Sequence, residues 1–240
     1  MNKIKIYIIT FIFSIICFGN AVAGTGAATE YKITIYKIEL CDSTSTASAC
    51  NGAITVYDGN SGAIDIANTS AGAAAASLGN AGVAKFGTSY TYLQITMSRA
   101  YTVKGSAEDS AGNTCYTSSS QTGAKGSNSE GTNSSGSEAS TTLYAAMVGT
   151  SVGDNLTGLS SLTDTTGVAS TIESDDEYFQ YRQQLASTFN MVQGNIPSVE
   201  VAFGTSNAVG AIGNMGSDCD TSSASVGMYA AEPDVTVTIK

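Results

Sequence analysis

The residues of this chain that could do chemistry are mainly carboxylates and cysteines, because histidine is absent. That absence excludes histidine-based catalytic triads, histidine-ligated zinc and histidine general bases. The 20 acidic residues offer many accidental carboxylate pairs, and no pair stands out by its spacing as a glycosidase site. We therefore expect a protein that is not an enzyme, with no catalytic residue and no cofactor.

One short acidic turn is the candidate cation site. Residues 58–65, DGNSGAID, bring together the oxygen-bearing side chains of Asp58, Asn60 and Asp65. Calcium takes oxygen ligands from such turns, but a plain hairpin turn explains the same residues and is the interpretation that we favour. Residues 174–177, SDDE, could also hold a cation, although a solvated acidic loop is the better explanation. We expect no bound metal, and Asp58, Asn60 and Asp65 are the weak candidates.

The cysteines indicate disulfide bonds. Cys41, Cys50, Cys115 and Cys219 remain once the predicted signal peptide is removed, and an even number of cysteines in an exported chain is typical of disulfides. Three pairings are possible. Cys41 with Cys50 is favoured because the two flank a short polar loop, which leaves Cys115 for Cys219. A four-cysteine metal site is disfavoured, because the chain has no C-x-x-C pair.

The first 23 residues read as a secretory signal peptide. Lys3 and Lys5 precede an apolar run over residues 6–18, and Ala21 and Ala23 place small residues where a signal peptidase cleaves. The apolar run is too short for a comfortable membrane anchor. We expect a chain that does not span a membrane after cleavage, located in the periplasm, at the cell surface or outside the cell.

Charge narrows the range of partners. Loss of Lys3 and Lys5 takes the formal net charge from −10 to −12. A protein this acidic repels phosphate backbones, so we expect no nucleic-acid partner.

The pattern of the remaining sequence predicts an all-β domain over residues 24–240. Short runs of Val, Ile, Thr and Tyr recur between turn residues, which is typical of strands. In the run over residues 31–40, Ile33 and Ile35 lie on one face but Ile38 and Leu40 lie on the other. The two-residue period therefore slips near Tyr36 and Lys37, which predicts either a β-bulge or a strand that crosses between two sheets.

The longest predicted strand covers residues 86–103. Its alternation places five apolar side chains on one face: Leu93, Ile95, Met97, Tyr101 and Val103. Arg99 falls on the same face, and we expect it near a sheet end.

Other segments complete the outline. The pattern predicts further strands at 53–57, 63–67, 142–148, 198–203 and 233–240, and one or two helical turns within 70–80. Residues 171–192 fit either a helix or a strand, and we favour the strand because their neighbours are strands. Ser, Thr and Gly dominate residues 117–141, which predicts a partly disordered insert loop over 105–141.

The first half of the chain resembles a known family. The segments YKITIYKIELC, AIDIANTSAGAAAASLG and FGTSYTYLQITMSRAYTV, with the turn Gly87-Thr88-Ser89-Tyr90, resemble exported bacterial transthyretin-like (prealbumin-like) β-sandwich proteins. The resemblance covers about half of the mature chain. It implies an antiparallel β-sandwich with one short helix and a structural, adhesive or ligand-binding role, and it carries over no catalytic residues.

Two functional hypotheses follow. The first is an exported structural or adhesive surface module that self-assembles through strand exchange, with residues 24–35 as the donor strand. The second is a periplasmic or extracellular domain that binds a glycan or another small ligand. The expected partners are thus a second copy of the chain or a surface glycan. Six tyrosines of the first half could form a binding face: Tyr31, Tyr36, Tyr57, Tyr90, Tyr92 and Tyr101.

Overall fold

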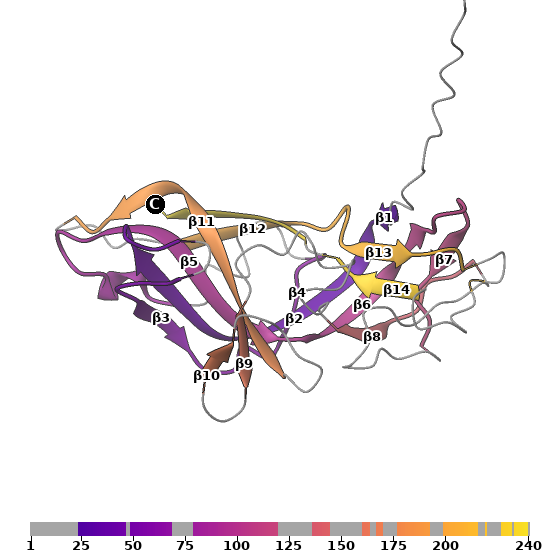
Figure 1. Cartoon of the computed structure of the whole chain (residues 1–240), viewed down its shortest axis with the longest axis horizontal. Coiled ribbons are helices and arrows are strands. Elements are labelled where there is room, and N and C mark those ends of the chain that lie inside the picture. The colour runs from indigo at the N-terminus through magenta and orange to yellow at the C-terminus, as the bar shows by residue number, and fades with distance from the viewer. Residues whose placement is uncertain are drawn as a thin grey trace, which may run out of the picture.

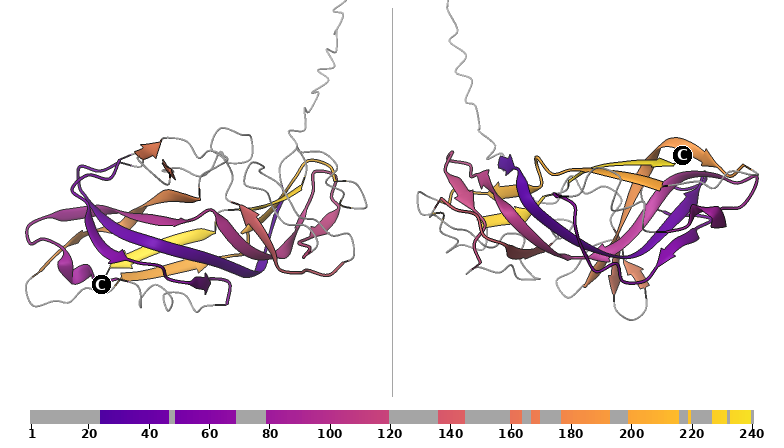
Figure 2. Two further views of the ribbon diagram at one scale, coloured as in Figure 1. Left: turned by 90° about the horizontal axis from the view of Figure 1, so that it is seen from below. Right: turned by 180° about the vertical axis from the view of Figure 1, so that it is seen from behind.

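The computed structural model describes residues 24–46, 49–68, 79–119, 136–144, 160–163, 167–169, 177–192, 199–215, 219, 227–231 and 233–239. Most of these residues are in strands, and every ladder is antiparallel. A large curled sheet faces two small sheets across a shared core (Figures 1 and 2). The predicted class, an all-β antiparallel sandwich, is confirmed. The predicted signal peptide and residues 70–78 of the predicted helix lie outside the described residues.

The helical part of the described chain is one 3-10 turn, η1 (Ala81–Val83), capped by Asn80. No helix within the described residues has the length and apolar character needed to cross a bilayer. The strands run in chain order as β1 (Gly24–Gly26), β2 (Ala28–Asp42), β3 (Ile54–Asp58), β4 (Ala63–Asp65), β5 (Ser89–Ser98), β6 (Ala100–Glu108), β7 (Thr114–Tyr116), β8 (Thr141–Tyr144), β9 (Ser160–Thr163), β10 (Gly167–Ala169), β11 (Tyr178–Asn190), β12 (Val199–Gly204), β13 (Val209–Ile212), β14 (Gly227–Ala230) and β15 (Asp234–Ile239).

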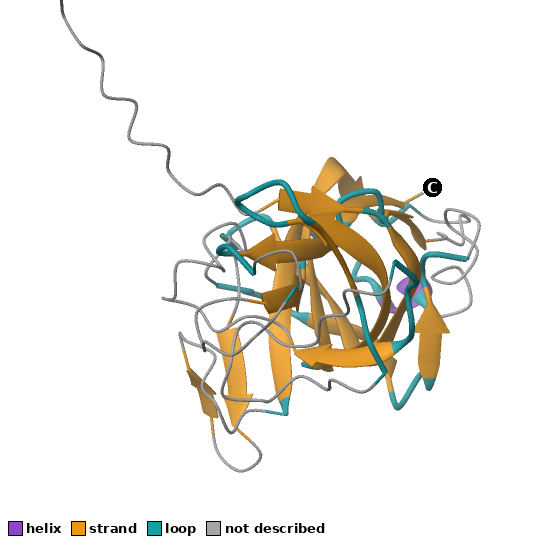
Figure 3. Ribbon diagram, turned by 90° about the vertical axis from the view of Figure 1, so that its right-hand side faces the viewer, coloured by secondary structure: helices purple, strands orange, loops and turns teal. Residues whose placement is uncertain are grey.

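Strand β2 organises the large sheet, because other strands pair with both of its edges. One edge pairs first with β6 and then with β5, and the other edge pairs with β4 and then β3. Ile38, for example, lies opposite both Ile95 on β5 and Tyr57 on β3. Strand β11 pairs with the far edge of β5, and β8 with the far edge of β6. Viewed from the end, the strands curl around a common interior (Figure 3).

A β-bulge explains the slip in the pattern of β2. The register against β5 shifts between Ile35 and Lys37, so that one residue more on β2 is accommodated there. As a result Ile33 and Ile35 before the bulge and Ile38 and Leu40 after it all reach the same core. The first of the two predicted explanations, the β-bulge, is therefore confirmed.

The predicted apolar face of β5 and β6 is confirmed, because Leu93, Ile95, Met97, Tyr101 and Val103 are all buried in the core. The expectation for Arg99 is wrong. Arg99 lies at the junction of β5 and β6, in the middle of the sheet, where it is only 1% exposed. Its backbone N–H donates to the carbonyl oxygen of Glu177 at 3.0 Å. This bond links the point where β5 ends and β6 begins to the residue before β11.

The proposed donor strand is already part of the chain's own sheets. Strand β1 pairs with β13, and β2 is central to the large sheet. The backbone also passes very close to β6: a Cβ atom on Gly26 would lie 2.0 Å from the carbonyl oxygen of Ser106, so only glycine fits there. Residues 24–35 are therefore not a free segment, and self-assembly through them would require the sheets to open first.

The structure also bears on the predictions for residues 171–192 and 105–141. Tyr178–Asn190 form β11, so the strand prediction for this part of 171–192 is confirmed, while residues 171–176 lie outside the described residues. Of the predicted insert over 105–141, the first residues complete β6 and form β7, and residue 141 begins β8. Residues 120–135 lie outside the described residues.

Both predicted disulfides are present. Cys41–Cys50 closes the loop that follows β2, and Cys115–Cys219 joins β7 to the segment between β13 and β14. Their sequence separations are 9 and 104 residues. Because the entropy lost by the unfolded chain grows with loop length, the first contributes about 2.5 kcal/mol and the second about 4.7 kcal/mol.

Asp109 holds together the same end of the molecule as the long disulfide. Its carboxylate accepts hydrogen bonds from the backbone N–H groups of Ala111 and Asn113 in the β6–β7 turn, and from that of Met215 after β13. Burial alone would raise the pKa of Asp109, but the bonds from Asn113, Met215 and Ala111 outweigh it and hold the pKa below its ordinary value.

We expect the substitution Asp109→Asn to lower the free energy of unfolding at pH 7 by about 2 kcal/mol, since the amide cannot accept on both sides as the carboxylate does. The lowered pKa means that the wild-type carboxylate stabilises the fold above the unfolded-state pKa, near 4, and that this contribution is lost as pH falls through the folded-state pKa. Denaturant unfolding between pH 7 and pH 3 measures both effects.

The matched control is Asp58→Asn, because Asp58 lies exposed at the end of β3. The control should unfold like the wild type at pH 7. Equal losses in the two variants, or no loss in Asp109→Asn, would contradict the role assigned to Asp109.

Candidate functional site

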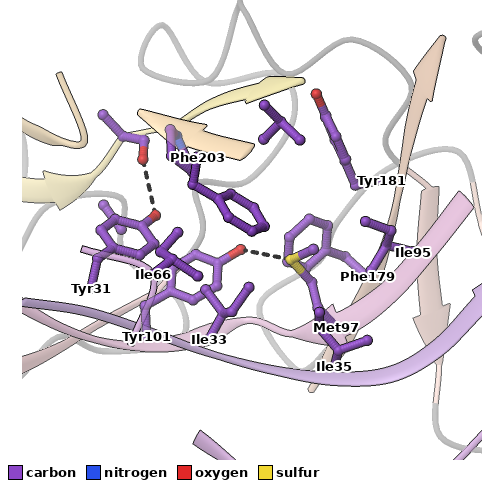
Figure 4. Close-up of a pocket in the computed structure, with 14 residues that line it drawn as sticks. Tyr31, Ile33, Ile35, Ile66, Ile95, Met97, Tyr101, Phe179, Tyr181 and Phe203 are labelled. Carbon is purple, nitrogen blue, oxygen red and sulfur yellow. Dashed lines mark hydrogen bonds between the residues drawn. The ribbon is translucent and has the colours of Figure 1, made fainter. Parts of the chain in front are cut away.

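The candidate site is an apolar pocket between the large sheet and the strands that face it. Its floor comes from β2, β5, β6 and β11, and its roof from β12, β14, β15 and the residues that link the last two (Figure 4). The lining residues are Tyr31, Ile33, Ile35, Ile66, Ile95, Met97, Tyr101, Phe179, Tyr181, Phe203, Ala230, Ala231, Pro233 and Val235. None of these fourteen side chains is charged.

Strand register positions the floor. Ile35 lies opposite Met97 across the β2–β5 ladder, and Met97 lies opposite Phe179 across the β5–β11 ladder. Side chains directly opposite each other in a ladder share a face of the sheet. The three strands therefore present one continuous apolar row toward the roof, and the bulge in β2 keeps Ile33 and Ile35 aligned with it.

Aromatic rings fill one side of the floor. The ring centroids of Tyr31 and Tyr101 lie 5.4 Å apart, and those of Tyr101 and Phe179 lie 6.3 Å apart in an edge-on arrangement. The Tyr101 hydroxyl donates to the sulfur of Met97 at 3.5 Å. Such contacts fix the rings, so this wall is rigid.

One hydrogen bond joins the floor to the roof. The Tyr31 hydroxyl donates to the carbonyl oxygen of Ala231 at 2.9 Å, and the N–H of Ala231 donates to the carbonyl oxygen of Ala208. Ala231 lies just beyond β14, so the bond positions the start of the segment that leads to Pro233 and β15. Phe203 points from β12 toward the floor, as Figure 4 shows.

The mouth of the pocket lies where its lining is half-buried. Tyr181, Phe203, Pro233 and Val235 are partly exposed, whereas the remaining lining residues of the floor are buried. The empty volume is about 610 Å³ when the open space at the mouth is included. Because that figure counts solvent outside the lining, it is an upper limit on the space that a ligand could occupy.

The candidate cation ligands do not converge. Asp65 lies opposite Lys32 and Asp58 lies opposite Lys37, five residues apart along β2, which is about 17 Å in an extended strand. The carboxylate of Asp65 accepts hydrogen bonds from the N–H groups of Tyr31 and Ala67 and from the side-chain amide of Asn68. Burial acts to raise the pKa of Asp65, but these bonds outweigh it and leave the pKa lowered. Asp65 thus has a structural role in its turn.

The amide oxygen of Asn60, the remaining candidate, accepts from the N–H of Gly62 in the turn after β3. Within the described ranges, no group of three histidine, cysteine, aspartate or glutamate residues could hold a metal ion. Residues 174–176 of the second candidate lie outside the described residues.

The six tyrosines of the first half do not form one binding face. Tyr31 and Tyr101 line the pocket, whereas Tyr90 is fully buried elsewhere in the core. Tyr36, in the bulge, instead packs edge-on against Tyr178 at 4.7 Å between ring centroids.

The other face of the large sheet carries a buried polar layer that the sequence analysis missed. Glu39, Gln94 and Arg182 lie in one row across β2, β5 and β11. The amide of Gln94 donates to Glu39 at 2.8 Å, and Lys37 forms an ion pair with Glu39 at 2.5 Å. Burial lowers the pKa of Arg182, and the charge of Glu39 partly offsets that effect. The bond from Gln94 to Glu39 joins neighbouring strands, so we assign the layer a structural role.

An exposed apolar patch lies at the end of the molecule. It consists of Val83, Phe86 and Val192, and Phe86 is 64% exposed. A bridge between Phe86 and Met191 brings the segment after η1 next to the end of β11.

One serine motif of the sequence falls on residues that the structure does not describe. Residues 149–153, GTSVG, match the G-x-S-x-G spacing of hydrolase nucleophiles, but they lie outside the described residues. Without histidine the chain cannot supply the usual base for such a serine, so we derive no chemistry from it.

Sequence reasoning found the floor strands and missed the pocket. Phe179, Phe203 and Val235 each appear in the sequence as apolar positions in alternating strands, but only the folded chain shows that three distant segments meet. The four partly exposed apolar positions at the mouth have no distinct sequence pattern.

Comparison with family models, with curated proteins and with solved structures gave no match to this chain. The transthyretin-like resemblance therefore stays a prediction, and the site rests on its geometry alone.

We expect Tyr31→Phe to lower the free energy of unfolding by about 1–3 kcal/mol, because it leaves the buried carbonyl of Ala231 without its hydroxyl donor. Tyr101→Phe is the matched control. This variant removes a hydroxyl from the same wall of the pocket. Because that hydroxyl donates to a thioether sulfur, which is a weak acceptor, its loss should lower the free energy of unfolding by less. Urea unfolding of both variants measures the difference, and equal costs would contradict the importance of the bond between floor and roof.

Proposed function

We propose that this protein is an exported domain that binds one small apolar molecule in the pocket between its sheets. The observation that carries the proposal is the uncharged pocket between the sheets, whose half-buried lining residues include Tyr181 on β11 and Val235 on β15. Burial of apolar surface would drive binding at about 25 cal/mol per Å². The rigid aromatic wall limits the ordering cost, because its rings are already fixed in the empty protein.

A glycan fits this pocket poorly. Each sugar hydroxyl taken from water needs a hydrogen-bonding partner, and an unpaired one costs about 1–3 kcal/mol. The walls offer mainly aliphatic and aromatic carbon, and the tyrosine hydroxyls of Tyr31 and Tyr101 already donate within the protein. A surface glycan as partner, and the hypothesis of a structural or adhesive module, remain predictions that concern other surfaces.

The exported location forms part of the proposal. Two disulfides, Cys41–Cys50 and Cys115–Cys219, are consistent with an oxidising environment such as the periplasm or the exterior of the cell. A carrier or receptor of apolar molecules is useful there, since such molecules dissolve poorly in the water between membranes.

Binding of the uncharged fluorescent probe N-phenyl-1-naphthylamine to the disulfide-bonded protein tests the proposal. We expect one probe per protein, with enhanced emission, and a rise in melting temperature. At a probe concentration of one hundred times Kd, binding adds about 2.7 kcal/mol to the free energy of unfolding. We expect the substitution Val235→Trp, which places a large ring in the mouth, to weaken binding at least about tenfold, or 1.4 kcal/mol.

The control for this experiment is Gln184→Trp, at an exposed position on the opposite face of β11. The chain contains no tryptophan, so each variant also reports its own position by fluorescence. Energy transfer from the tryptophan to the probe should be stronger from position 235. No binding by the wild type, or the same weakening in both variants, would contradict the proposal.

A further inference from the structure

We infer that the pocket accepts an uncharged, hydrocarbon-like molecule and excludes the ionised carboxylate of the same chain length. This inference rests on the proposed function and names the chemical class of its ligand. It follows from the charges, the hydrogen-bond donors and the strand directions around the pocket.

The hydrogen-bond donors of the lining are already in use. The hydroxyls of Tyr31, Tyr101 and Tyr181 donate to the carbonyl of Ala231, to the sulfur of Met97 and to the side-chain oxygen of Gln183. A carboxylate needs donors, and each one recruited here would break a bond that exists in the empty protein. The weakest of these bonds is that of Tyr101 to sulfur, so the pocket can satisfy one neutral acceptor more easily than a charged group.

The charge next to the mouth is negative. Asp234 is exposed and stands between Pro233 and Val235, both of which line the pocket. The whole chain carries a formal net charge of −10, so the surrounding potential also repels anions. A ligand carboxylate that stayed at the mouth, in water, would therefore meet repulsion.

None of the described cations of the large sheet is among the residues that line the pocket. Arg182 follows Tyr181 on β11, and successive side chains of a strand point to opposite faces. Its guanidinium belongs to the polar layer, where Glu39 acts on it, and Lys37 of β2 pairs with the same glutamate. Arg99 is buried at the junction of β5 and β6 and is not one of the lining residues.

A carboxylate inside the pocket would thus be desolvated with no charged side chain among the lining residues, which costs far more than burial of a hydroxyl. In practice the molecule binds weakly or binds in its protonated form. Uncharged alcohols, hydrocarbons and aromatic compounds avoid this cost.

Competition between decan-1-ol and decanoate for bound N-phenyl-1-naphthylamine tests the inference. The experiment uses the disulfide-bonded protein at pH 8, where the carboxylic acid is ionised. We expect decan-1-ol to displace the probe at a concentration at least about tenfold lower than decanoate. At pH 5 part of the acid is protonated, so a lower concentration of decanoate should displace the probe, while the concentration of decan-1-ol needed should not change. The difference between the two competitors should therefore be smaller than at pH 8.

A charge-switch variant makes the test specific. Val235→Lys places a cation at the mouth and should narrow the ratio between the two competitors at pH 8 by about tenfold. Gln184→Lys makes the same change in net charge on the opposite face of β11 and should leave the ratio as in the wild type.

The outcomes separate the two proposals. Equal displacement by decanoate and decan-1-ol, or the same ratio in Val235→Lys as in the wild type, would overturn the exclusion of anions while leaving an apolar site in place. Failure of the wild type to bind the probe at all would overturn the proposed function itself.

Discussion

The pairing of β2 along both of its edges is the constraint on which the rest of the structure depends. Strands β5 and β6 share one edge and β3 and β4 the other, so the backbone groups of this strand are largely bonded within the chain. The single bulge between Ile35 and Lys37 then decides which side chains reach the core. Without the extra residue, Ile38 and Leu40 would turn to the polar layer, and Glu39 would be driven into the apolar interior.

The pocket is a consequence of that arrangement together with the small size of the facing sheet. Strands β12 and β15 form a two-stranded pair that covers only part of the large sheet. A pair of strands alone is marginal, so its position depends on packing and on the links that lead to it. The bond from Tyr31 to Ala231 supplies one such link, and the long disulfide and Asp109 fix the segments around β13 and β14. The incomplete cover leaves an apolar space open at one side.

Local pattern predicted much of the fold but little of the site. The alternation of Leu93, Ile95 and Met97 and the slip at Tyr36 could be read from neighbouring residues, because each depends on short-range periodicity. The short spacing of Cys41 and Cys50 predicted the first disulfide, and the second followed by elimination. The pocket could not be read in this way, because Phe203 and Val235 line it together with β2, although they lie more than 160 residues further along the chain. The burial of Arg99 could not be predicted, because it depends on the break between β5 and β6 and not on the pattern of either strand. The intrachain pairing of residues 24–35 could not be predicted, because an N-terminal strand looks the same in a sequence whether its partners are its own or another chain's.

Nuclear Overhauser contacts between decan-1-ol and methyl-labelled protein test most directly whether an apolar ligand binds in the pocket, because they locate the bound molecule. We expect contacts from the alkyl chain to the methyl groups of Ile33, Ile95 and Met97 on the pocket floor. Contacts only to Val83 and Val192, in the exposed patch at the end of the molecule, would show ordinary surface adhesion and contradict it.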